Sequence, residues 1–149
     1  MKSLRSLFVP VVLAAMAVSA CASEWMVDYN KALELSKKTG KPILADFTGS
    51  DWCGWCIKLK KEVFSKPEFA TWAKKNVILL ELDYPRSKPQ SDSIKKQNAG
   101  LATKYEIQGY PTILFIGSKG QVLGQYGYDA GGPKVWTDKA SKMLKGRKA

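Results

Sequence analysis

The sequence predicts a mixed α/β fold in which helices cover both faces of a central mixed β-sheet. Short apolar runs with little polar alternation, typical of strands buried on both faces, occur at residues 42–49, 77–84 and 112–117. Amphipathic segments with helical spacing separate these runs, and a tight turn at residues 118–120 leads from the third run into a further strand over residues 121–128. The resulting order is α-β-α-β-α-β-β-α, which suits a sheet between two layers of helices.

Apolar spacing and capping signals define the helices. The expected helical segments span residues 25–41, 53–64, 65–72, 93–105 and 133–144. Gly40 is a stop signal for the first of them. The sequence SKPE at residues 65–68 fits a capping box with Pro67 in the first turn, so a new helix should begin there. The polar, proline-bearing residues 85–92 indicate a surface loop.

Residues 1–20 have the pattern of an export signal. A basic start precedes an apolar core at residues 7–18, which is shorter than the about 20 apolar residues that span a membrane. Two cleavage sites are open: VSAC resembles the lipobox of bacterial lipoproteins, which would make Cys21 the lipidated first residue, whereas ACA fits ordinary cleavage after Ala22. Either way we expect one domain over residues 21–149, outside the cytoplasm, where thiols tend to oxidise.

Composition excludes several function classes. The formal net charge is +11, but the lysines are dispersed and no arginine-rich run or RNA-binding aromatic motif accompanies them. We therefore expect no nucleic-acid partner. The chain has no histidine, which excludes Ser-His and Cys-His nucleophile pairs and histidine-containing metal sites. We expect neither a metal nor a cofactor.

Cys53 and Cys56 lie three residues apart in the sequence SDWCGWC, at the start of the second helical segment. At positions i and i+3 the two side chains share one helix face, so a reversible disulfide is feasible. Free N–H groups and the helix dipole would stabilise the thiolate of Cys53, which is the attacking form. Cys56, one turn deeper, should be shielded and keep its proton. The pair thus has the form of a nucleophile and a resolving thiol, because Cys56 would displace a partner bound to Cys53 as a mixed disulfide.

Two other roles for the cysteine pair remain open on the sequence. A structural disulfide across a four-residue loop would constrain the unfolded chain little, so it would be a poor staple. A metal site normally needs four ligands, and the pair offers two. A soft Cu(I) site also remains open, although Met26 and Met143 show no matching spacing.

The sequence DFTGSDWCGWCIKL, followed at a distance by EIQGYPTILFIGSKGQVLGQYGY, resembles the thioredoxin superfamily. The shared pattern is a buried strand, W-C-x-x-C at a helix start, and G-x-P-T before a strand and hairpin; it covers roughly residues 41–144. It looks closest to small exported bacterial thioredoxin-like proteins with a WCGWC site, related to the C-terminal domain of membrane disulfide reductases. The resemblance implies the thioredoxin fold and thiol–disulfide exchange.

The resemblance implies roles for five further residues near the cysteine pair. Pro111 matches the family's cis-proline, which presents the backbone of Tyr110 to an extended substrate, although its pattern alone equally fits an ordinary turn proline. Trp52 matches the tryptophan beside the active site, where we expect an exposed ring on the docking surface. Trp55, which we also expect to bind substrate, stands where thioredoxin has proline, and the dipeptide between the two cysteines tunes the redox potential. Gly127 resembles a glycine that leaves room for a bound peptide; it could also simply ease a strand bend.

Asp46 corresponds to the buried acid of thioredoxins that helps move the proton of the resolving cysteine. Burial raises the pKa of a carboxyl group towards the range of a general base, although this carboxyl could instead only bond to nearby backbone. The chain has one residue more than thioredoxin between this acid and the first cysteine, around Gly49 and Ser50. Thioredoxins also place a lysine near the acid on the adjacent strand, and the sequence VILLEL supplies none.

These expectations combine into a thiol–disulfide oxidoreductase of the periplasm or cell envelope that acts on exported proteins. We expect the reducing direction, with a membrane disulfide reductase as electron donor; oxidation and isomerisation remain alternatives. We also expect a monomer that contacts the membrane only through a lipid anchor at Cys21. The alternative from another class is a non-catalytic binding protein of the same fold, with a fixed disulfide and a basic surface for an acidic partner.

Overall fold

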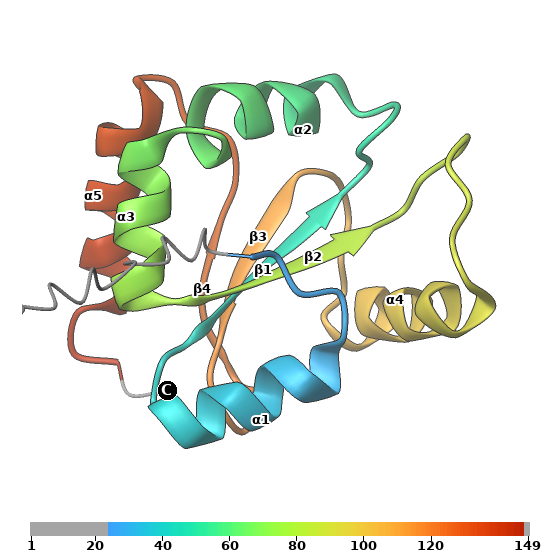
Figure 1. Ribbon diagram of the computed structural model, residues 1–149, viewed down its shortest axis with the longest axis horizontal. Helices are drawn as coiled ribbons and strands as arrows, with labels where there is room; N and C mark the ends of the chain where they lie inside the picture. Colours follow the sequence, from blue (N-terminus) through green and yellow to red (C-terminus); the bar gives the residue numbers. More distant parts are fainter. Residues whose placement is uncertain (1–23, 148–149) are drawn as a thin grey trace, which may run out of the picture.

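Four strands form one mixed sheet in the computed structural model, which describes residues 24–147 (Figure 1). The strands are β1 (Ile43–Thr48), β2 (Ile78–Asp83), β3 (Thr112–Ile116) and β4 (Val122–Tyr126). Their order across the sheet is β2-β1-β3-β4, with β1 parallel to β2 and antiparallel to β3. The hairpin of β3 and β4 completes the sheet. The expected mixed sheet is confirmed.

Helices cover both faces of this sheet, as expected. They are α1 (Tyr29–Thr39), α2 (Gly54–Leu59), the π-helix η1 (Lys60–Phe64), α3 (Pro67–Asn76), α4 (Asp92–Lys104) and α5 (Gly132–Leu144). Helices α1 and α4 lie on one face, and α2, α3 and α5 lie on the other (Figure 1). The α2 face is the one that matters for function, because α2 begins directly after the first cysteine.

The alternation of side chains along β1 decides which residues face α2. Successive side chains of a strand point to opposite faces. Ile43, Ala45 and Phe47 belong to the apolar cluster beneath α1 and α4, whereas Leu44 belongs to the cluster beneath α2, α3 and α5. Asp46 has the same parity as Leu44, so its carboxyl group points to the α2 face. A buried strand thereby delivers one acid to the layer that holds the cysteines.

Trp136 of α5 anchors the layer on the α2 side. Its side chain is fully buried and lies edge-on to the rings of Phe64 and Phe69, with centroids 5.4 and 5.7 Å away. Its indole N–H donates to the backbone oxygen of Gly127 at 2.9 Å. Aromatic burial of this kind contributes several kcal/mol in order of magnitude. The packing also fixes the chain just after β4, close to Pro111.

Three helix boundaries differ from the expectation. The first helix begins at Tyr29, with Asp28 as its N-cap, because Met26 pairs with Leu80 as an extra bridge at the edge of the sheet. The predicted capping box at residues 65–68 is wrong: Lys66 is the N-cap of α3 and makes no side-chain capping bond. The reason is Pro67, which disfavours helical geometry in the residue before it. The same helix also continues past residue 72, to Asn76.

The expected export signal and Cys21 lie outside the described residues. Within residues 24–147, no helix is long and apolar enough to cross a membrane.

Candidate active site

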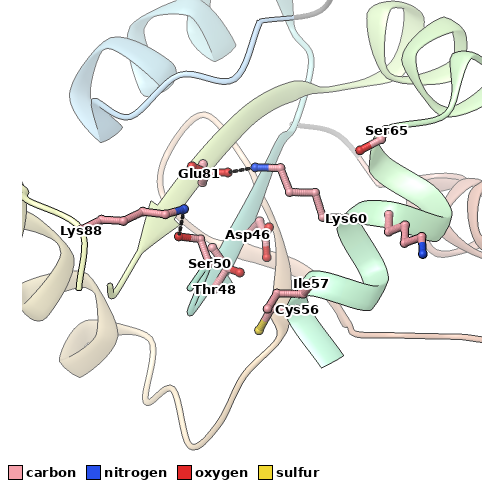
Figure 2. Close-up of a pocket in the computed structure, with 10 residues that line it drawn as sticks. Asp46, Thr48, Ser50, Cys56, Ile57, Lys60, Ser65, Glu81 and Lys88 are labelled. Atoms are coloured by element: carbon pink, nitrogen blue, oxygen red, sulfur yellow. Dashed lines mark hydrogen bonds and ion pairs between the residues drawn. The ribbon is translucent and has the colours of Figure 1, made fainter. Parts of the chain in front are cut away.

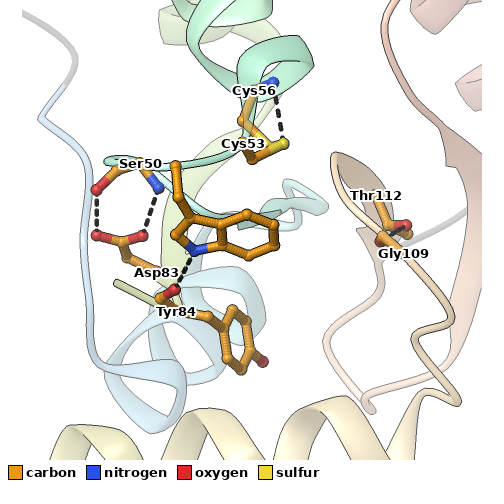
Figure 3. The surroundings of a disulfide bond; sticks show 8 residues. Ser50, Cys53, Cys56, Asp83, Tyr84, Gly109 and Thr112 are labelled. Atoms are coloured by element: carbon orange, nitrogen blue, oxygen red, sulfur yellow. Dashed lines mark hydrogen bonds between the residues drawn. A yellow bond between two sulfur atoms is a disulfide. The ribbon is translucent and has the colours of Figure 1, made fainter. Parts of the chain in front are cut away.

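Cys53 and Cys56 form a disulfide at the N-terminus of α2 (Figure 3). Their Cα atoms are 5.2 Å apart, as the i and i+3 spacing allows. Cys53 is the N-cap residue of the helix, and its Sγ atom accepts the backbone N–H of Cys56 at 3.2 Å. The first sulfur therefore sits at the positive end of the helix, where negative charge is stabilised.

We expected Cys56 to be more shielded than Cys53, but the two cysteines differ little in exposure. Cys53 is 6% exposed and Cys56 is 4% exposed. What distinguishes the two residues is their surroundings: Cys53 caps the helix, whereas Cys56 lines a cavity between α2 and the sheet. The chemical asymmetry of the pair thus comes from its neighbours.

This cavity has a volume of about 440 Å³ and is lined by Cys56 on the helical side and Asp46 on the sheet side (Figure 2). Its charged and sulfur-bearing lining residues are Asp46, Cys56, Lys60, Lys61, Glu81 and Lys88. The Oδ1 atom of Asp46 is buried and has no hydrogen-bond partner among the described residues. Such an atom is costly to bury unless water or a reacting group supplies a partner. The sequence left open that this carboxyl group only bonds to nearby backbone. Oδ1 makes no such bond within the part of the chain described.

Burial raises the pKa of Asp46 to about 8, from an ordinary value of 3.8. Desolvation is the largest cause, since it disfavours the charged carboxylate. The negative charge of Glu81 raises the pKa further, the positive charge of Lys60 lowers it, and Asp83 raises it by the smallest amount. The carboxyl group is thus poised to exchange a proton near neutral pH.

Lys60 and Glu81 are site residues that the sequence analysis missed. The Nζ atom of Lys60 lies 3.4 Å from Oε2 of Glu81, across the cavity wall (Figure 2). Glu81 lies beside Asp46 in the register of β1 and β2. A lysine therefore does approach the buried acid, but from the helical side rather than from the neighbouring strand. The sequence contained one signal for Lys60: it lies four residues after Cys56, and this spacing places the two side chains on one helix face.

The extra residue before the cysteines is absorbed by a loop bonded to the end of β2. The backbone N–H of Ser50 donates to Oδ1 of Asp83 at 2.9 Å, and its hydroxyl donates to Oδ2 at 2.6 Å (Figure 3). The amine of Lys88 donates to the Ser50 hydroxyl oxygen at 3.1 Å. Asp46 keeps its place beneath α2 because the insertion is taken up outside the strand.

Trp52 is half-buried, not exposed as expected, and its ring is held in place. Its indole N–H donates to the backbone oxygen of Tyr84 at 2.8 Å, and the guanidinium of Arg86 lies 4.1 Å from the ring centre. Asp51 fixes the same loop by accepting the backbone N–H groups of residues 86–88, and the first two of these bonds are the main causes that lower its pKa. Trp52 therefore connects the cysteine motif to the loop after β2.

The peptide bond between Tyr110 and Pro111 is cis. Tyr110 lies edge-on to Trp52, with ring centroids 5.7 Å apart. A Cβ atom on Gly127 would lie 3.5 Å from the backbone oxygen of Pro111, which is an ordinary contact. The chain itself would thus accommodate a Cβ atom at position 127.

Trp55 is the exposed aromatic residue of the motif. Its side chain is 59% exposed, and its ring packs against Tyr128 with centroids 5.1 Å apart. The amine of Lys58 lies about equally far from both rings, at 5.2 and 5.1 Å. The tyrosine hydroxyl donates to Glu62 at 2.6 Å. An aromatic surface formed by Trp55 and Tyr128 therefore adjoins the cysteine pair.

The described residues contain no group of three or more Cys, His, Asp or Glu side chains placed to hold a metal ion. The Cys53–Cys56 pair is bonded sulfur to sulfur. What this site can do chemically is open and close that bond beside a titratable acid.

Comparison with known proteins agrees with this chemistry. A family model described as Thioredoxin-like matches residues 24–118. Disulfide bond reductase DsbH of Chlamydia pneumoniae is 35% identical over 128 residues, which is 86% of this chain and 76% of that protein. Thiol:disulfide interchange protein DsbD of Klebsiella pneumoniae is 32% identical over 87 residues, 58% of this chain but 13% of that protein.

A solved structure of a DsbH oxidoreductase superposes with a TM-score of 0.81 at 31% identity, covering 99% of this chain and 96% of that one. The matched family model spans the buried acid, the cysteine pair and the cis-proline, and the structural match extends over the whole fold. The chain belongs to the thioredoxin-like family and is a thiol–disulfide oxidoreductase.

Proposed function

We propose that this protein reduces disulfide bonds of exported proteins in the bacterial cell envelope, with Cys53 and Cys56 as its dithiol. The observation that carries the proposal is the cavity shared by Cys56 and Asp46 behind a helix-capping Cys53. This arrangement supplies each group that dithiol exchange requires: a stabilised thiolate, a resolving thiol, and a base that takes the proton of the resolving thiol.

In the first step, the thiolate of Cys53 attacks one sulfur of a substrate disulfide. A bond forms between the Cys53 sulfur and that substrate sulfur, the substrate S–S bond breaks, and the other substrate sulfur leaves as a thiolate that takes a proton from water. The N–H of Cys56, now 3.2 Å from the Cys53 sulfur, would stabilise the thiolate before attack.

In the second step, Asp46 takes the proton of the Cys56 thiol. The Cys56 sulfur attacks the Cys53 sulfur, the bond to the substrate breaks, and the second substrate sulfur leaves as a thiolate that takes a proton from water. The protein dithiol is oxidised to a disulfide and the substrate disulfide is reduced to two thiols, so electrons balance. A carboxyl with a pKa of about 8 is well matched to a thiol proton.

Substrate binding is proposed for the surface around the cysteines. The backbone of Tyr110 at the cis-proline Pro111 would pair with an extended substrate segment, and Gly127 would leave room for it. Trp55 offers an exposed aromatic face to substrate side chains. Trp52 acts indirectly, since it is packed against Tyr110 and the loop after β2.

Similarity to named proteins and the pattern of the N-terminal residues support the finer parts of the proposal, namely the direction of the reaction, the electron donor and the location. The DsbH relative is named a disulfide bond reductase, which favours reduction. Similarity to a segment of DsbD favours a membrane disulfide reductase as the electron donor. The export pattern of residues 1–20 favours the envelope, with lipidation at Cys21 or cleavage after Ala22.

Insulin reduction by dithiothreitol tests the proposal. The protein should accelerate precipitation of the insulin B chain, and Cys53→Ser should not. The burial of both cysteine residues, 6% and 4% exposed, favours a second candidate: a binding scaffold whose disulfide stays closed. In that case neither the protein nor the variant would accelerate precipitation, and dithiothreitol would leave the Cys53–Cys56 bond intact.

A further inference from the structure

An ion pair borders the cavity lined by Asp46, whose Oδ1 atom has no hydrogen-bond partner within residues 24–147. The Nζ atom of Lys60 and Oε2 of Glu81 are 3.4 Å apart, and both residues line the cavity (Figure 2). Lys60 is the first residue of η1, four positions after Cys56. A π-helical turn is rare and occurs often at functional sites. The lysine therefore belongs to the same helical segment as the resolving cysteine.

Glu81 is the charged residue next to Asp46 on the sheet. The two are register partners on the parallel strands β1 and β2, which lie about 4.8 Å apart, so their side chains leave the same face of the sheet side by side. Two carboxylates this close oppose each other's ionisation. The positive charge of Lys60, which is ion-paired with Glu81, offsets that repulsion.

The other charged groups around Asp46 have separate roles. On β2, Asp83 is bonded to Ser50, and on the loop Lys88 bonds the same serine. On η1, Lys61 lines the cavity but is not among the ion-paired side chains of residues 24–147. The β3 residue opposite Asp46 is Ile113, which carries no charge. Lys60 and Glu81 are thus a pair of opposite charges beside Asp46, and they change its pKa in opposite directions.

We propose that Lys60 and Glu81 are positioning residues whose opposite charges set how readily Asp46 takes the proton of Cys56. The proposal rests on the proposed function, in which Asp46 accepts that proton. Lys60 favours the carboxylate and Glu81 favours the protonated acid. The Lys60 side chain is 61% exposed and that of Glu81 25%, so the pair lies where the cavity meets solvent and can respond to a bound partner.

Titration of the Asp46 carboxyl group by carbon NMR in the oxidised protein tests the proposal. This measurement does not depend on an activity assay. Lys60→Met should raise the pKa of Asp46 by about one unit and Glu81→Gln should lower it by about one unit, the size of effect that a charge a few ångströms away exerts. Lys60→Arg, which keeps the charge, should leave it near the wild-type value. Lys61→Met is the matched control from the same cavity wall and should change it little.

The pH profile of insulin reduction is the second readout. The pH of half-maximal rate should move up in Lys60→Met and down in Glu81→Gln, and neither change should move it in an Asp46→Asn background. A merely structural role would lower the rate at every pH without moving the profile. Equal titration of Asp46 in wild type, Lys60→Met and Glu81→Gln would overturn the proposal. Opposite NMR shifts without any insulin reduction by the wild type would uphold the electrostatic pair and overturn the proposed function instead.

Discussion

Asp46 and Cys56 line one cavity, Asp46 from strand β1 and Cys56 from helix α2. The buried acid has a hydrogen-bonding oxygen without a partner among the described residues, and the neighbouring cysteine is closed in a disulfide. A carboxyl group in this setting destabilises the folded protein whenever it is ionised. We therefore expect the buried acid to lower the stability of the folded protein, and the free energy of unfolding measures this cost.

Asp46→Asn should stabilise the oxidised protein at neutral pH. The folded-state pKa of about 8 lies above the ordinary 3.8, so between these values the folded protein holds a proton that the unfolded chain has released. Wild-type stability therefore falls as pH rises from about 4 to 8. The variant should gain up to about 4 kcal/mol in free energy of unfolding at pH 7. Urea unfolding at several pH values measures this.

The gain from Asp46→Asn should disappear as the pH falls to about 4, because the carboxyl is then protonated in both states. Glu34→Gln, at an exposed position of α1, is the control and should differ from wild type by less than about 0.5 kcal/mol at every pH. A stability difference for Asp46→Asn that does not depend on pH would refute the assignment of a buried, protonated acid.

Gly49→Ala should disturb the loop that leads into the cysteine pair. A Cβ atom there would lie 2.5 Å from Cε2 of Trp52, whose ring is held by its bond to Tyr84. We expect a loss of about 1–3 kcal/mol in free energy of unfolding from this overpacking. Gly54→Ala is the matched control: a Cβ atom would meet nothing within 4 Å, and alanine favours the helix by about 0.4–1 kcal/mol. Equal stability of the two variants in urea would contradict the packing.

Trp55→Ala should weaken substrate binding without weakening the fold. Since the ring is 59% exposed, its removal should change the free energy of unfolding by less than about 0.5 kcal/mol. Loss of one aromatic contact should raise KM for insulin about 5–10-fold, with kcat little changed. Val122→Ala, on β4 and 51% exposed, should leave KM unchanged. An unchanged KM in Trp55→Ala would remove this ring from the proposed docking surface.

The sequence predicted much of the fold because its signals were local. The apolar runs at residues 42–49 and 77–84 became β1 and β2, and the cysteine spacing placed a disulfide at a helix start. The capping box failed because two local rules competed at Ser65 and Pro67, and the effect of proline on the preceding residue prevailed. Local patterns are reliable where a single physical effect dominates.

The electrostatics of the site could not be predicted in the same way. The contact of Lys60 with Glu81 depends on how α2 and η1 lie over the sheet, and that arrangement is tertiary. The sequence analysis looked for a lysine on the strand and found none there. Trp52 was expected to be exposed for a related reason, since its bond to Tyr84 joins residues 32 positions apart.

The most direct test of the central claim is the capture of a mixed disulfide. Reduced Cys56→Ala, mixed with insulin, should accumulate a covalent adduct that mass spectrometry maps to Cys53, because no resolving thiol remains to release the substrate. Cys53→Ala should form no comparable adduct at Cys56, since that residue faces the cavity rather than the helix cap. Adducts at Cys56 as abundant as those at Cys53, or none in either variant, would contradict the account.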